Sequence, residues 1–117
     1  MMEHWFRVVE LHNGDILKRR LVMEFDEEHE LIGRFITFEV PSFYDEIMDA
    51  ITAVYDGRDI KSGFSGNVIS LAILTDLAVV YEEDDLGEIS YCKTELKELY
   101  ELISEYRERE LELIKGI

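Results

Sequence analysis

The sequence predicts an α+β fold, in which a mostly antiparallel sheet of about six strands packs with two amphipathic helices. Segments rich in β-branched and aromatic residues, separated by turn signals such as Asn13-Gly14, predict the strands. Apolar residues that recur every three or four positions after Pro41 and after Thr94 predict the helices. No repeat, linker or low-complexity segment divides the chain, so we expect residues 1–117 to form one domain.

The N-terminal part of the chain predicts strands. The first is His4–Leu11, and Asn13-Gly14 then predicts a two-residue hairpin turn, because this dipeptide tolerates positive φ at both central positions. Asp15–Phe25 is the predicted returning strand. Leu31–Val40 is predicted as a third strand, and a short helix over Glu27–Arg34 is the alternative.

Two segments have a helical period. Pro41-Ser42 interrupts the chain, and Ser42 can cap a helix that ends at Gly57. Its predicted apolar face consists of Phe43, Ile47, Ile51, Val54 and Tyr55. Thr94 is the predicted cap of a final helix that runs to about Ile114. The apolar face of that helix consists of Leu96, Leu99, Tyr100, Ile103, Tyr106 and Ile114.

The segment between the helices predicts a loop and a three-stranded meander. Residues 57–67 are the predicted loop, and the strands are Asn67–Thr75, Leu77–Tyr81 and Glu88–Cys92. Because Asn67–Thr75 is apolar on both faces, we expect other elements to pack on each side of it.

Composition excludes several classes of protein. The chain has 27 acidic and 12 basic side chains, and its net charge of -15 opposes direct binding to nucleic acid. A single cysteine excludes an internal disulfide framework. No apolar stretch is long enough for a membrane span, and the start of the chain lacks the features of a signal peptide, so we expect a cytoplasmic protein without a membrane partner.

Motifs for catalysis or for cofactor and metal binding are weak. The three histidines have no ligand-spaced neighbours, and the acidic segment 82–87 lacks the spacing of a calcium loop. The glycine-rich segment Gly63-Phe64-Ser65-Gly66 is predicted to be a flexible connection rather than a phosphate loop. Cys92 is predicted to be a small buried hydrophobe; a thiol activated by Lys93 is the alternative. We therefore expect no enzyme activity, no cofactor and no metal.

The distribution of acids carries the strongest functional signal. Glu98, Glu101, Glu105, Glu108 and Glu112 share a narrow arc of the last helix, opposite its apolar face. Asp45, Asp49 and Asp56 repeat this arrangement on the first helix. Segregated carboxylates of this kind can steer a cationic partner, although a face that serves only solubility is the alternative. The candidate partner-binding residues are Glu82, Glu83, Asp84, Asp85, Glu88, Glu98, Glu101, Glu105 and Glu108.

The C-terminal half resembles bacterial immunity proteins of contact-dependent growth inhibition and other polymorphic toxin systems. The matching features are Ser65-Gly66-Asn67 before the apolar strand Val68–Leu74, and Thr94-Glu95-Leu96 before the last helix. The resemblance implies an inhibitor that binds a cognate toxin domain, often a basic nuclease, by placing carboxylates where the toxin binds phosphate. We expect such a protein to be a monomer or a weak homodimer.

Two other functions remain open from the sequence. An acidic mimic of nucleic acid would bind several unrelated DNA-binding proteins instead of one cognate toxin. A small-ligand domain would hold its ligand in a pocket under the loop Gly57–Asn67.

Overall fold

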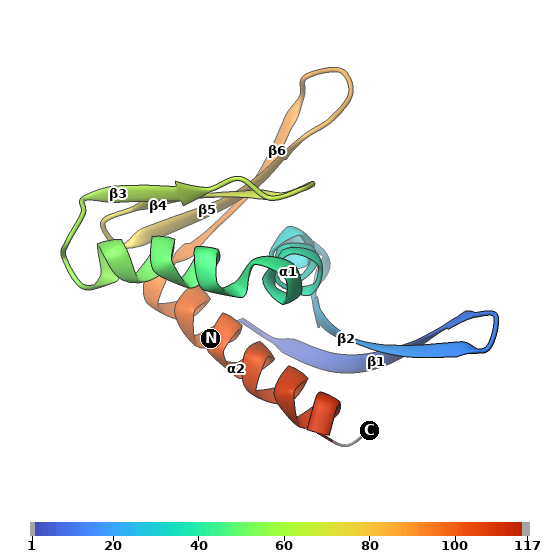
Figure 1. Ribbon diagram of the computed structural model, residues 1–117. Coiled ribbons are helices and arrows are strands. Elements are labelled where there is room, and N and C mark those ends of the chain that lie inside the picture. Colours follow the sequence, from blue (N-terminus) through green and yellow to red (C-terminus); the bar gives the residue numbers. More distant parts are fainter. Residues whose placement is uncertain (1, 116–117) are drawn as a thin grey trace.

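Figure 1 shows the computed structural model, which describes residues 2–115. The elements are β1 (His4–Asn13), β2 (Ile16–Phe25), the 3₁₀ turn η1 (Glu27–His29), α1 (Glu30–Tyr55), β3 (Lys61–Phe64), β4 (Ser70–Leu74), β5 (Leu77–Glu83), β6 (Ile89–Glu95) and α2 (Leu96–Lys115). The predicted α+β class is confirmed, with six antiparallel strands and two α-helices. The strands lie in two sheets, however: a β1–β2 hairpin and a four-stranded meander in the order β3-β4-β5-β6.

The turn of the β1–β2 hairpin is shifted by one residue from its predicted position. Asn13 pairs with Ile16, so Gly14 and Asp15 are the two central residues. Gly14 has φ of 66°, whereas no described residue other than glycine has positive φ. Positive φ at the first central position alone is typical of a type II′ turn, which glycine favours there.

The predicted strand Leu31–Val40 is wrong, because this segment forms the first half of α1. The alternative, a helix near Glu27–Arg34, is closer to the structure. Ile32, Phe35 and Ile36 are fully buried and follow a helical spacing. This half of α1 lies between the two sheets (Figure 1), so it is buried on several sides and carries the bulky apolar residues that also suit a strand.

A kink divides α1 where the sequence predicts a helix start. Pro41 lies inside the helix and has no N–H to donate, and Phe43 leaves the helical region with φ of -131° and ψ of 28°. The second half ends at Tyr55, and Gly57 follows with φ of 78°. This positive φ ends the helix where the sequence predicts it. Ile47, Ile51 and Val54 are buried as predicted, whereas Tyr55 is exposed.

The four-stranded sheet is covered on one face. Both helices lie on that side (Figure 1), and the inward-facing residues Leu71, Ile73, Ala78 and Val80 are buried. Its first strand, β3, occupies part of the segment predicted as a loop. No element of the described chain covers the other face, so the prediction that β4 would be packed on both sides is wrong.

The last helix begins at Leu96, directly after β6, and buries most of its predicted apolar face. Leu96, Leu99, Ile103 and Tyr106 are buried, whereas Ile114 is exposed. Thr94, the predicted cap, is part of β6, and its hydroxyl donates to Glu98 Oε2 over 3.5 Å.

The hairpin is attached to the helices along the outer edge of β2. The backbone N–H of Met23 donates to Thr37 Oγ1 of α1 over 3.0 Å. The phenol of Tyr106 on α2 donates to the carbonyl oxygen of Leu21 over 2.9 Å. Side chains of both helices therefore form hydrogen bonds with backbone groups that would otherwise be unpaired at the outer edge of β2.

We expect Tyr106→Phe to lower the free energy of unfolding by about 1 kcal/mol, the usual value of one hydrogen bond. Urea unfolding at neutral pH measures this loss.

Burial raises the pKa of the Tyr106 phenol above its ordinary value, so the folded state keeps the proton after the unfolded state has lost it. Stability should therefore fall as pH rises above about 10, the pKa of an unfolded tyrosine, and should fall less in Tyr106→Phe. Urea unfolding between pH 8 and pH 11 measures this, with exposed Tyr91→Phe as the control. An equal pH dependence in all three proteins would contradict it.

Candidate protein-binding surfaces

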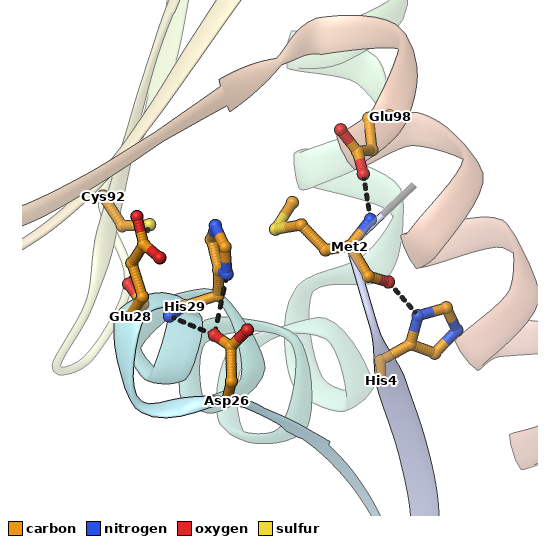
Figure 2. A network of polar contacts seen from close by, with 7 residues as sticks. All are labelled: Met2, His4, Asp26, Glu28, His29, Cys92 and Glu98. Carbon is orange, nitrogen blue, oxygen red and sulfur yellow. Dashed lines mark hydrogen bonds and ion pairs between the residues drawn. The ribbon is translucent and has the colours of Figure 1, made fainter.

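The predicted acidic residues of α2 divide into two groups. Glu98 Oε1 accepts from the backbone N–H of Met2 over 2.6 Å, and Glu105 Oε2 lies 3.0 Å from Nε2 of His4 (Figure 2 shows the first of these contacts). These two carboxylates hold the start of the chain against α2. Glu101 and Glu108 are exposed, and neither has a hydrogen bond or an ion pair within residues 2–115.

The acids of the β5–β6 hairpin divide in the same way. Glu82 receives two hydrogen bonds from Arg34 of α1, at 2.8 and 3.0 Å, which raise the pKa of Arg34 and link the helix to β5. Asp84 Oδ1 accepts from the backbone N–H groups of Leu86 and Glu88, each over 2.9 Å, and so fixes the turn. The side chains free of such contacts in the described chain are those of Glu83, Asp85 and Glu88, all exposed.

The structure does not bring the two acidic groups together. The hairpin turn precedes β6 and α2 follows it, so the length of β6 separates them, roughly 20 Å at the usual rise per residue. Figure 1 shows the hairpin turn and α2 extending from opposite ends of β6. The acids therefore form two surfaces rather than one.

The uncovered face of the four-stranded sheet is an apolar surface that sequence reasoning missed. Tyr81 pairs with Tyr91, and Leu74 pairs with Leu77, so these side chains stand on the same face. The full set on this face is Lys61, Gly63, Ser70, Ala72, Leu74, Leu77, Val79, Tyr81, Glu83, Ile89, Tyr91, Lys93 and Glu95. Part of the signal was present as apolar residues on both faces of the predicted strand Asn67–Thr75, which we interpreted as burial on both sides.

Cys92 lies on the covered side of the sheet, beside the start of α1. Its Sγ donates to the carbonyl oxygen of Glu28 over 3.8 Å (both residues appear in Figure 2). Burial raises the pKa of the Cys92 thiol, and the carboxylates of Glu28 and Asp26 raise it further. The alternative of a thiol activated by Lys93 is therefore wrong, since Lys93 stands on the opposite face.

A buried carboxylate, Glu39, fixes the glycine-rich loop that was predicted to be flexible. Its oxygens accept from the backbone N–H groups of Asn67, Val68 and Ile69 at 2.9, 3.4 and 3.3 Å. A Cβ on Gly66 would lie 2.1 Å from the carbonyl oxygen of Ile69, so only glycine fits there. The loop before β4 is thus bound to α1.

The cavities of the protein do not lie where a small-ligand domain was predicted to hold its ligand. One cavity of about 390 Å³ lies between β2 and the start of α1, and another of about 420 Å³ adjoins Tyr55, Asp76 and Lys97. Neither lies under the loop Gly57–Asn67 where the ligand-binding alternative placed its pocket.

Within residues 2–115, no three His, Cys, Asp or Glu side chains are grouped as the ligands of a metal ion would be. No helix of these residues is both long and apolar enough to cross a membrane.

These observations describe a small α+β protein with two exposed groups of acids and one exposed apolar sheet face. Over 100 residues the chain is 32% identical to a Bacillus cereus protein named "Immunity protein", and the match covers 83% of this chain and 84% of that relative. The chain therefore belongs to a family of immunity proteins. No protein-family model and no solved structure matches it.

Proposed function

We propose that the protein binds a cognate toxin domain in the cytoplasm and neutralises it. The observation that carries the proposal is the 32% identity to an immunity protein over most of both chains. We further propose that the toxin belongs to a contact-dependent growth inhibition or related polymorphic toxin system. The immunity protein acts as an inhibitor and not as an enzyme.

The charge of the protein suits a basic toxin. A nuclease binds phosphate groups with Lys and Arg side chains, and carboxylates can occupy the same side chains. Of the nine acids predicted to bind the partner, Glu83, Asp85, Glu88, Glu101 and Glu108 have side chains that are free to do so in the described chain. Glu82, Asp84, Glu98 and Glu105 also hold the fold together, so their loss would affect stability as well as binding.

Capture of partners from the lysate of the source cell, eluted by steps of salt and identified by mass spectrometry, tests the function. The expected result is one basic protein whose C-terminal toxin domain is encoded beside the gene of this chain. Co-expression of that domain with the immunity protein should restore growth to a host that the domain alone kills. Capture of many unrelated DNA-binding proteins, with no rescue of growth, would support the nucleic-acid mimic instead.

Charge reversal on α2 should slow association with the toxin. In the double variant Glu101→Lys/Glu108→Lys we expect the association rate at low salt to fall by roughly tenfold, because long-range attraction accelerates encounter. The difference should disappear at high salt, where the charges are screened. Glu27→Lys/Glu28→Lys, which changes the net charge equally at the exposed turn η1, is the matched control. Equal rates for both variants would show that the position of the acids on α2 does not matter.

A further inference from the structure

We propose that the uncovered face of the four-stranded sheet is the surface on which the toxin docks. The occupant is a basic protein that packs an apolar patch against Tyr91, Ile89 and Leu74 and places cationic side chains at the ends of the strands. This inference rests on the proposed function and assigns its central contact surface; the acids of α2, which lies on the covered side of the sheet, then act on the toxin by long-range attraction and not by contact.

The apolar part of this face is exposed and continuous. Tyr91 is 62% exposed, Ile89 61% and Leu74 50%, although all three lie within strands. The register places Tyr81 beside Tyr91 and Val79 beside Lys93, and joins these pairs to Leu74 and Leu77 across β4 and β5. Contiguous apolar surface of this kind commonly marks a contact with another protein.

The centre of this face is held rigid before any partner arrives. β4 and β5 are paired on both sides, and their opposite face is packed against the helices through buried residues such as Ile73 and Val80. Tyr91 stands beside them on the edge strand β6, which is paired with β5. An aromatic side chain on such a sheet loses little conformational freedom on binding. Tyr91 is therefore suited to act as an anchor of the interface.

Acids lie at both ends of the apolar surface. Glu83, Asp85 and Glu88 are exposed at the hairpin end, and Asp76 and Glu95 are exposed at the other end. An apolar centre with a charged rim is the usual anatomy of a protein interface. Lys61 and Lys93 stand on the same face, and Lys93 Nζ lies 5.6 Å from the centre of the Tyr91 ring. The partner should therefore present at least one acid among its cations.

Charge favours a basic partner over a second copy of this chain. A second copy would add another net charge of -15 and its own acidic strand ends, whereas a basic protein neutralises them. The β1–β2 hairpin also exposes apolar residues, among them Leu11 and Leu17, but it carries the basic segment Lys18–Arg20, which repels such a partner.

The test uses the purified toxin domain encoded beside the gene of this chain. We expect Ile89→Ala/Tyr91→Ala to raise Kd by roughly 30-fold or more, mainly through faster dissociation that persists at high salt. Leu11→Ala/Leu17→Ala is the matched control, since those residues are 47% and 48% exposed on strands of the other sheet, and its affinity should equal that of the wild type. Thermal unfolding of each variant verifies that it is folded.

Three results would overturn the inference. Unchanged affinity in folded Ile89→Ala/Tyr91→Ala, with toxin binding by the wild type intact, would move the interface elsewhere and leave the proposed function standing. Sedimentation of the protein alone that shows a dimer, abolished by the same variant, would assign the face to a second copy. Failure of the wild type to bind the toxin domain would overturn the proposed function together with this inference.

Discussion

Glu39→Ala should lower the free energy of unfolding by roughly 2–4 kcal/mol, because it removes a buried charged acceptor from three backbone donors. Glu39 is 1% exposed, and its carboxylate receives the N–H groups of Asn67, Val68 and Ile69. Without it, the buried N–H of Ile69 and the partly buried N–H groups of Asn67 and Val68 lose their acceptor, and the loop before β4 loses its attachment to α1. Urea unfolding followed by circular dichroism measures the change.

Two variants make this test specific. Glu39→Gln keeps one acceptor oxygen but turns an N–H₂ group towards donors. We therefore expect its free energy of unfolding to lie between that of the wild type and that of the alanine variant. Glu46→Ala removes an exposed acid from the same helix and should change stability little. A loss below about 1 kcal/mol in Glu39→Ala would mean that water replaces the carboxylate as acceptor.

Gly33→Val should destabilise the protein by about 2–3 kcal/mol through overpacking between α1 and β2. A Cβ at Gly33 would lie 2.7 Å from the carbonyl oxygen of Met23 and 2.9 Å from Cδ1 of Phe25. The backbone oxygen cannot move without disturbing the contact between Met23 and Thr37. Thermal and urea unfolding both measure the loss.

The double variant Gly33→Ala/Phe25→Leu separates the two close contacts. If the carbonyl oxygen of Met23 dominates, removal of the Phe25 ring should not restore the stability that Gly33→Ala loses. Gly33→Ala alone should lose less than Gly33→Val, since alanine favours a helix by about 1 kcal/mol over glycine. A fully stable Gly33→Val would show that α1 can move away from β2 at little cost.

Local patterns were sufficient for most of the fold. The two strands of the hairpin, the helix after Pro41 and the final helix all follow from periodicity and turn residues. The error at Leu31–Val40 has a physical cause: a helix buried between two sheets is apolar on several sides, so its period is obscured. The stripe of Ile32, Phe35 and Ile36 carried the correct signal, but β-branched and aromatic content outweighed it.

The candidate surfaces were only partly accessible from sequence. Charge patterning identified the acids, but it could not show that Glu82 binds Arg34 or that Glu98 binds the N–H of Met2, since both contacts join residues far apart in the chain. The uncovered sheet face was missed for a related reason. An apolar strand facing a partner protein has the same sequence pattern as one facing its own core.

The alternation of side chains along β5 and β6 has a consequence for how these proteins diverge. Core residues such as Val80 and Thr94 alternate with uncovered residues such as Val79, Tyr81 and Tyr91. Exchanges at the exposed positions of the uncovered face, such as Tyr91, disturb little internal packing, so relatives that bind different toxins can acquire new specificities by changing alternate residues of these strands. Alignments of such relatives should show substitutions concentrated at these positions, while the buried positions Ala78 and Val80 retain their apolar character.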